Sequence, residues 1–218
     1  MPVSADPPEI ILLTTSSTCN LSFNRNQRSN MAHKPIAAGK SSFDLIDFTT
    51  FLSALDLDGE IVFMDVACGI GNYAIEIARQ IRDRGTVHAF DLWEEGITKL
   101  RLKAGSLRLE NIEATVCDVS KKIPLGDHSV DICLMATVLH DLVEDGTHAS
   151  TMKEIIRVMK PAGKLAVVEF KRTPGPPGPP EKVRLSPVEL DQVLLPFGFH
   201  RRQLLELGAV TYLSTFSR

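Results

Sequence analysis

An acidic residue and two glycines follow a short apolar run in the first half of the chain, and together they indicate a ligand site. The apolar residues 61–64 lead into Asp65, and a turn that contains Gly69 and Gly71 comes next. Glycine lets a turn take positive φ angles and lets a ligand approach the backbone closely. A helix starting at Asn72 would offer its free N–H groups to a negative group. Because Asp65 is itself negative, the turn suits a cation such as an ammonium better than a phosphate.

From Asp65 to Gly71 the turn reads Asp-x-Ala-x-Gly-x-Gly. This resembles motif I of the class I S-adenosylmethionine (SAM)-dependent methyltransferases, which is usually Asp/Glu-x-Gly-x-Gly-x-Gly. The resemblance implies that the turn binds SAM through Asp65, Ala67, Gly69 and Gly71, and that S-adenosylhomocysteine (SAH) is the product. A strand, turn and helix without any ligand would also account for two glycines, so the motif needs support from elsewhere in the chain.

Two further acids end predicted strands, where open α/β sheets bind their ligands. Asp91 follows Gly71 at the spacing at which an acid binds ribose hydroxyls in nucleotide-binding units. The resemblance gives Asp91 this role toward SAM and counts the adjacent Leu92 as a cofactor contact. It also implies that Asp118 binds the adenine amino group and that Val119 touches the ring. A helix cap at Asp91 and a turn-forming Asp118 are the structural alternatives.

Residues 135–141 end the fourth predicted strand and resemble motif IV of the same enzymes, whose backbone lies against the methionine part of SAM. Ala136 and Thr137 are therefore expected cofactor contacts. Residues 160–165 resemble the kinked Lys-Pro-Gly-Gly-type turn that precedes the fifth strand of the family. Together the resemblances cover residues 43 to about 216, nearly the whole expected domain.

A general base is wanted only where the methyl acceptor carries a proton, because the methyl group of SAM is already electrophilic. His140 is the best candidate, since an unperturbed histidine has a pKa near 6.5 and this one lies at a strand's carboxyl end. Asp141 and Glu169 come next. A loop histidine that packs on the ligand or caps the following helix is the alternative for His140.

Apolar strands alternate with amphipathic helices along the chain, which predicts a parallel sheet covered on both faces. Strands are expected over residues 61–65, 86–91, 112–117, 130–137 and 164–170, with a terminal hairpin at 202–207 and 210–214. Helices are expected over residues 43–55 (capped by Ser41 or Ser42), from residue 72, over 94–109, through 152–159, and from 186–187 to 197. The resemblance implies an α/β, Rossmann-like sheet of seven strands in the order 3-2-1-4-5-7-6, with the last strand antiparallel and helices on both faces.

Length and composition fit one globular domain with a short extension. The chain has 218 residues, of which 44% are hydrophobic, and a net charge of −3. Residues 1–30 are rich in Ser, Thr, Asn and Pro and predict a disordered leader before a single domain over residues 31–218, with Met31 as a candidate start. No basic stripe favours nucleic acid, and no apolar run approaches the roughly 20 residues of a membrane span.

The cysteines and the segments expected around the methyl acceptor indicate which compartment and which class of acceptor to expect. Cys19, Cys68, Cys117 and Cys133 form no C-x-x-C pair and are expected to be reduced, which predicts a cytoplasmic protein without disulfides or a metal site. Within the family the chain resembles the small bacterial ubiquinone/menaquinone C-methyltransferase-like group. Arsenite-methyltransferase-like enzymes belong near that group, but the positions of these cysteines disfavour arsenite. The segments expected around the acceptor suit a small molecule: residues 34–43, 140–146 and 171–184.

Three alternative functions remain open at this stage. A nicotinamide dehydrogenase needs a third glycine where Ala74 stands, and Asp65 would repel its pyrophosphate. A phosphate-loop ATPase would explain Gly39-Lys40-Ser41, but its early glycine is replaced by Lys34. A SAM-binding module without catalysis has no sequence feature against it.

Overall fold

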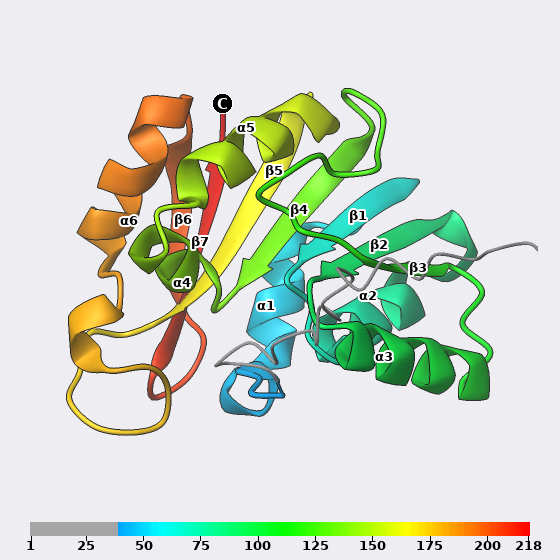
Figure 1. Ribbon diagram of the computed structural model, residues 1–218, viewed down its shortest axis with the longest axis horizontal. Helices are drawn as coiled ribbons and strands as arrows, with labels where there is room; N and C mark the ends of the chain where they lie inside the picture. The colour runs from blue at the N-terminus through cyan, green and yellow to red at the C-terminus, as the bar shows by residue number, and fades with distance from the viewer. Residues whose placement is uncertain (1–38) are drawn as a thin grey trace, which may run out of the picture. The chain divides into compact units, whose positions relative to one another are not determined.

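Seven strands form a mixed sheet in the computed structural model, which describes residues 39–218 (Figure 1). The strands are β1 (Ile61–Val66), β2 (Gly85–Asp91), β3 (Ile112–Val116), β4 (Val130–Ala136), β5 (Met159–Phe170), β6 (His200–Glu206) and β7 (Thr211–Ser217). Their order is β3-β2-β1-β4-β5-β7-β6, with β1 to β5 parallel and β7 antiparallel to both of its neighbours. The expected fold class, strand order and antiparallel last strand are confirmed. The predicted leader, Met31, Lys34 and Cys19 lie outside the described residues.

Helices cover both faces of this sheet. The α-helices are α1 (Phe48–Leu55), α2 (Asn72–Ile81), α3 (Glu94–Ser106), α4 (Leu139–Glu144), α5 (His148–Val158) and α6 (Pro187–Leu194), and four short 3-10 turns are η1 (Phe43–Leu45), η2 (Arg82–Arg84), η3 (Glu181–Val183) and η4 (Leu195–Phe197). Residues of α1, α2 and α3 share one core cluster with Phe63, whereas α4, α5 and α6 share the other with Met64. Since these two residues are neighbours on β1, the strand is buried on both sides. Among residues 39–218, no helix has the length and apolar character that crossing a bilayer requires.

The predicted helix over residues 43–55 is wrong at its start. Ile46 is extended, with φ −113° and ψ 151°, and separates η1 from α1. Asp47 caps α1 because its side chain accepts hydrogen bonds from the backbone N–H groups of Thr49 and Thr50. Ser42, one of the two expected caps, turns its hydroxyl toward Tyr73 instead.

The boundary between α5 and β5 also differs from the prediction. The helix ends at Val158, and Met159 already pairs with Val130 in the sheet. The register then shifts, so that Lys164 pairs with Ile132 and the four residues between form a bulge. A bulge tolerates proline because it needs no ladder N–H there. The expected turn is therefore an irregularity inside a strand.

Other predicted boundaries differ from the observed ones by a few residues, and one helix was not predicted. The third helix ends at Ser106 instead of residue 109, and β4 ends at Ala136 because Thr137 takes a left-handed φ of 53°. Helix α4 was not predicted, since six residues carry too little periodicity to be seen. The predicted start of α6 is confirmed by a capping box between Ser186 and Glu189.

Candidate functional site

The turn after β1 contains three residues with left-handed backbone. Ala67, Gly69 and Gly71 have φ angles of 57°, 59° and 76°. The two glycines serve different needs. A Cβ added at Gly69 would meet no atom within 4 Å, whereas one added at Gly71 would overlap the Leu100 side chain of α3. Gly71 thus allows helix packing, and Gly69 leaves open space beside the backbone where a ligand could lie.

A pocket opens at the carboxyl ends of β1 and β4. It is lined by residues of four segments: Lys40, Ser41, Ser42, Asp65, Ala67, Cys68, Gly69, Ile70, Asn72, Tyr73, Ala136 and Thr137. The fold therefore brings five predicted cofactor residues together, namely Asp65, Ala67, Gly69, Ala136 and Thr137. They come from parts of the sequence about 70 residues apart, as the crossover topology of an open α/β sheet requires.

Sequence reasoning named Ser42 as a helix cap and Thr137 as a cofactor contact, but it did not single out Tyr73, which lies beside Ser42. The Ser42 Oγ lies 2.9 Å from the Tyr73 hydroxyl and 3.3 Å from Thr137 Oγ1. These contacts tie the segment before η1 to the start of α2 and to the end of β4. Of the segment whose residues 39–41 resemble the end of a phosphate loop, the described residues Lys40, Ser41 and Ser42 line this pocket.

Asp65 is the most unusual group in the pocket. Its residue is 1% exposed, and its Oδ2 has no hydrogen-bond partner among the described residues. Burial and, next, the charge of Asp91 raise the pKa of Asp65 to about 8, against a weaker opposing effect from the backbone N–H of Ala74. A buried acid of this kind is stabilised by a cation or a donor brought in by a ligand.

Asp91 is bound to backbone on both sides. Its Oδ2 accepts a hydrogen bond from Gly69 N at 2.7 Å, and its Oδ1 accepts one from Trp93 N at 2.7 Å. The carboxylate therefore joins the end of β2 to the glycine turn of β1. It does not cap α3, whose N-cap residue is Trp93. Leu92 beside it is 58% exposed and is not among the residues that line the pocket.

Asp118 and Val119 are also not among the residues that line this pocket. Asp118 accepts hydrogen bonds from Ser120 N and Ser120 Oγ at 3.1 and 2.6 Å, and Lys121 Nζ lies 3.1 Å away. The Ser120 hydroxyl, together with Lys121, lowers the pKa of Asp118 against a smaller effect of burial. These contacts are those of a turn-forming aspartate. Val119 is buried in the core, and the adenine role of both residues stays a prediction.

The three candidate bases form one connected cluster. His140 Nδ1 lies 2.8 Å from Glu169 Oε2, and the backbone N–H of His140 donates to Glu169 Oε1 at 3.2 Å. On the other side of the ring, Nε2 lies 3.4 Å from Asp141 Oδ1. Glu169 is fully buried and His140 is 4% exposed, whereas the Asp141 side chain is 40% exposed.

The charges in this cluster favour a protonated histidine. Burial alone would lower the pKa of His140, but the hydrogen bond and charge of Glu169, with Asp141 and Glu144, outweigh it and raise that pKa. Burial chiefly raises the pKa of Asp141, although the His140 charge opposes it. An imidazolium held between two carboxylates cannot accept a further proton. The arrangement therefore favours His140 as a positioning group and leaves Asp141 as the exposed acid of the three.

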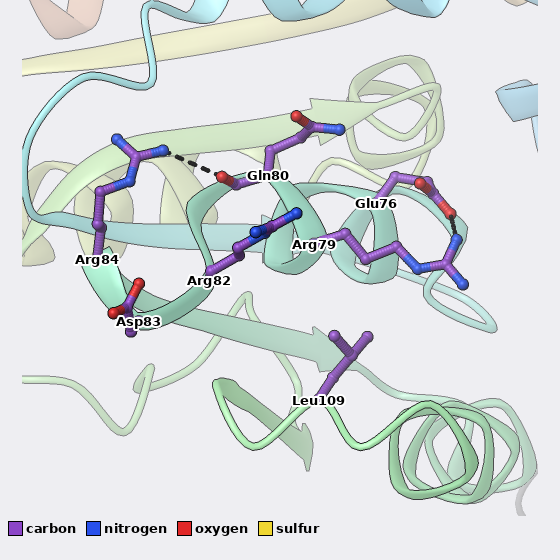
Figure 2. A pocket seen from close by; sticks show the side chains of 7 residues that line it. All are labelled: Glu76, Arg79, Gln80, Arg82, Asp83, Arg84 and Leu109. Carbon is purple, nitrogen blue, oxygen red and sulfur yellow. Dashed lines mark hydrogen bonds and ion pairs between the residues drawn. The ribbon is translucent and has the colours of Figure 1, made fainter.

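A second hollow lies beside the turn η2, which precedes β2, and has a structural explanation. Figure 2 shows it at the end of α2, lined by Glu76, Arg79, Gln80, Arg82, Asp83, Arg84 and Leu109. Arg84 donates to the last-turn carbonyl of Gln80 at 3.0 Å, which satisfies a helix end and complements its dipole. No predicted site residue lines this hollow.

Comparisons with known proteins agree with the fold and with the motifs. Residues 57–194 match the family model described as a methyltransferase domain. The ubiquinone/menaquinone biosynthesis C-methyltransferase UbiE of Rickettsia felis is 33% identical over 113 residues, 50% of this chain and 44% of that protein. The chain therefore spans less than half the length of that relative.

Solved structures extend the likeness over most of the described chain. A SAM-dependent methyltransferase from Aquifex aeolicus matches with a TM-score of 0.73 and 28% identity, over 81% of this chain and 92% of that one. The [4+2]-cyclase SpnF matches with a TM-score of 0.61 and 24% identity, over 73% and 58%. Since one of these neighbours is a cyclase, the fold alone does not establish methyl transfer.

Proposed function

This chain belongs to the methyltransferase-domain family, and we propose that it transfers the methyl group of SAM to a ring carbon of a small aromatic acceptor of the quinone-precursor class. The family match and the UbiE relative support the reaction type and the acceptor class. The single observation that carries the cofactor half is the unpartnered, buried Oδ2 of Asp65 in a pocket whose floor is left open at Gly69.

The residues around the pocket fit SAM. SAM would supply an electrophilic methyl group, and its amino acid part carries an ammonium that suits Asp65. Gly69 leaves room for the ligand, and Ala136 and Thr137 offer backbone from the end of β4. Asp91 holds the turn and is our proposed partner of the ribose diol. Gly71, Leu92, Asp118 and Val119 complete the proposed cofactor set.

On the acceptor side, the proposed reaction needs a place for one proton. Methyl transfer breaks a carbon–sulfur bond and forms a carbon–carbon bond, and the ring then loses the proton it carried at that carbon. Asp141 is our proposed acceptor for this proton because it is the exposed acid of its cluster and its pKa is raised. His140 and Glu169 would orient it.

Two alternatives compete with this proposal. A nicotinamide dehydrogenase is disfavoured because Asp65 stands where a pyrophosphate would lie and Ala74 replaces the third glycine. A SAM-binding module without catalysis would share every cofactor residue and differ only in turnover. We also propose a cytoplasmic location and a single domain over residues 31–218, supported by the unpaired Cys68, Cys117 and Cys133 of the described part.

Two assays separate these functions. Isothermal titration with SAM, SAH and NAD should give binding for the first two ligands only. Incubation with methyl-labelled SAM and a short-chain hydroquinone that lacks one ring methyl should then add one methyl group to the ring. Binding without any labelled product would favour the non-catalytic module, and binding of NAD alone would overturn the proposal.

A further inference from the structure

The segment after β5 has few backbone N–H groups of its own. Residues 173–180 read Thr-Pro-Gly-Pro-Pro-Gly-Pro-Pro, so only three of them carry a backbone N–H. At the start of this loop, Lys171 N donates to Val210 O and Thr173 N donates to Lys171 O. Its carbonyl groups therefore need donors from elsewhere.

Arg184 supplies those donors. Its Nε donates to Pro179 O at 2.9 Å. Its Nη1 donates to the carbonyls of Lys171 and Thr173 at 3.2 and 2.7 Å, and its Nη2 donates to those of Gly175 and Pro177 at 2.6 and 3.0 Å. One planar guanidinium thus binds five carbonyls spaced along residues 171–179, which matches its five N–H groups.

The Arg184 guanidinium is buried and makes its polar contacts with this loop. Arg184 is 2% exposed, and its carbon Cζ lies 5.7 Å from the centre of the Phe170 ring. It forms no salt bridge with an acid among residues 39–218. A buried charge without a carboxylate is costly unless dipoles surround it, so the loop and Arg184 stabilise each other. With every donor used, Arg184 has none left for a ligand.

The loop is fixed next to the candidate base cluster. Leu185, the residue after Arg184, accepts a hydrogen bond from the Tyr212 hydroxyl of β7 at 2.6 Å. Turn η3 at the end of the loop packs against α4, the helix that begins with Leu139 and carries His140 and Asp141. Glu169 lies on β5 two residues before the loop begins. Figure 1 shows the loop beyond the end of β5.

We propose that Arg184 is a positioning residue that folds residues 171–180 into one wall of the acceptor site. This inference rests on the proposed function, because it assigns the wall to the methyl acceptor of that reaction. Arg184 acts through the loop and through α4, and it touches neither acceptor nor cofactor. Its removal should therefore weaken acceptor binding and leave the glycine turn of β1 unchanged.

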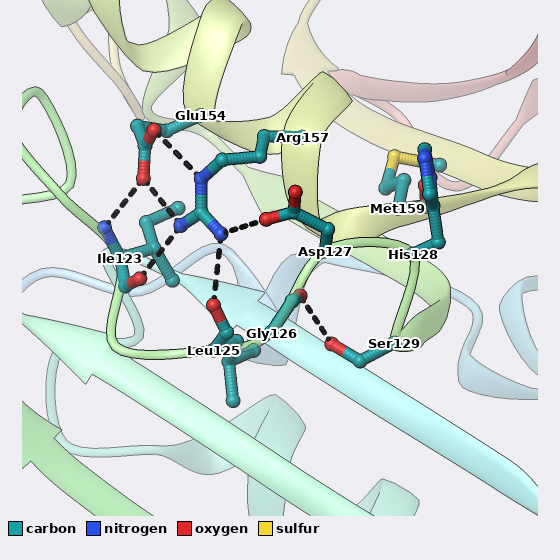
Figure 3. A network of polar contacts seen from close by, with 9 residues as sticks. All are labelled: Ile123, Leu125, Gly126, Asp127, His128, Ser129, Glu154, Arg157 and Met159. Carbon is teal, nitrogen blue, oxygen red and sulfur yellow. Dashed lines mark hydrogen bonds and ion pairs between the residues drawn. The ribbon is translucent and has the colours of Figure 1, made fainter.

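A second arginine offers a matched control. Figure 3 shows Arg157, which also organises a loop: its Nη1 donates to Leu125 O at 2.9 Å and its Nη2 to Ile123 O at 2.8 Å. It differs in that Glu154 and Asp127 pair with it. The carbonyls that it binds lie shortly before the start of β4, whereas the pocket lies at the carboxyl end of that strand. Arg157→Met should lower stability without changing acceptor binding.

The test compares Arg184→Met, Arg184→Lys and Arg157→Met in the full chain. For each variant we would measure thermal unfolding, the Kd for SAH, and the KM values for SAM and for a short-chain demethylated hydroquinone. Both Arg184 variants should raise the acceptor KM about tenfold, with the SAH Kd and the KM for SAM within twofold. Lysine keeps the charge but not the planar fork, so it should not rescue the acceptor KM.

Amide hydrogen exchange supplies a readout that does not depend on the acceptor. In Arg184→Met, exchange should rise in residues 171–180 and in α4, and should stay unchanged in residues 66–71. An acceptor KM like that of the parent, or an equal rise in Arg157→Met, would overturn the proposal. If the parent protein leaves the hydroquinone unmethylated, the acceptor part of the proposed function fails. The exchange of α4 then decides the positioning role, and unchanged exchange there rejects it.

Discussion

The candidate site has a cofactor half around the glycine turn after β1 and an acceptor half around His140 and the loop after β5. Different interactions hold these two halves in place. At the ends of β1 and β2, left-handed backbone and small residues shape the turn, and the Asp65 carboxyl is left without a partner on one oxygen. At the ends of β4 and β5, buried charged groups shape the walls, and each is bound: Glu169 to His140, and Arg184 to five carbonyls.

The Asp65 carboxyl therefore has an oxygen free to bind a ligand, whereas Glu169 and Arg184 support the surrounding structure. A buried polar atom without a hydrogen-bond partner destabilises the fold. Such an atom is expected where ligand binding supplies the missing partner. A guanidinium whose five N–H groups are all used, as in Arg184, has no donor left for a ligand and instead fixes the backbone around it. The cofactor half should therefore respond to mutation mainly in affinity, and the acceptor half mainly in geometry.

The largest effect should come from Gly69→Val. A β-branched side chain fills the open space beside the turn and resists a φ of 59°. We expect SAH affinity to fall at least about 100-fold, while the free energy of unfolding falls by only about 1–3 kcal/mol. SAH titration and thermal unfolding measure the two quantities.

Gly71→Val is the matched variant in the same turn. Its side chain would overlap Leu100 in the core, so it should lose more stability than Gly69→Val. Equal stability losses, or parent-like SAH binding in Gly69→Val, would show that the two glycines do not differ as described.

A smaller difference in SAH affinity is expected between Asp91→Ala and Asp118→Ala. Asp91→Ala removes the two hydrogen bonds that tie Gly69 and Trp93 to β2, as well as the proposed ribose contacts. Asp118→Ala removes local turn contacts with Ser120 and Lys121, as well as one proposed adenine contact. SAH titration should show a loss larger for Asp91→Ala by about 1.5–3 kcal/mol, since bonds to a charged group have this strength. A larger loss in Asp118→Ala would assign the nucleoside contact to the end of β3.

Asp65→Asn tests the buried acid through pH. The pKa of Asp65 is about 8 in the folded chain and lies near 4 when unfolded, so the folded state binds one more proton between these values. Its contribution to the free energy of unfolding therefore falls by up to about 1.4 kcal/mol per pH unit from pH about 4 to about 8. Relative to the asparagine variant, the parent should lose stability across this range. A constant difference in Tm between pH 5 and pH 8 would contradict the raised pKa.

The smallest effect is expected in the acceptor half, with Glu169→Gln. The pKa of His140 is raised in the fold, so the stability it contributes is present below pH 6.5 and is lost as pH rises through the folded pKa. Removing the Glu169 charge should cost about 1–3 kcal/mol at pH 6 and less at pH 9, measured by thermal unfolding. A cost that grows with pH would mean that His140 is neutral in the fold.

The sequence predicts the cofactor half better than the acceptor half, for a physical reason. Asp65, Gly69 and Thr137 lie where strands end, and strand ends follow from local periodicity and turn chemistry. The hydrogen bonds of Ser42 with Tyr73 and Thr137 cross 31 and 95 residues and leave no local pattern. Glu169 was named only as a candidate base, and its pairing with His140 depends on the register of β4 against β5.

The loop after β5 shows the same limit. Its prolines and glycines predict an irregular connection, which the structure contains. Nothing near Arg184 in the sequence indicates that its side chain folds back on the carbonyls of residues 171–179. The bulge at residues 160–163 and the short helix α4 were also missed, because neither has a periodic signal.

The most direct test of the central claim is proton release on SAH binding at pH 7. SAH would be titrated calorimetrically in two buffers with different ionisation enthalpies. In the free protein Asp65 is mostly protonated at this pH, since its pKa is about 8. An ammonium bound beside it would lower that pKa, so we expect SAH to bind with release of close to one proton, and the Asp65→Asn variant to release none. SAH binding without proton release, or binding of NAD in place of SAH, would contradict the account of this pocket.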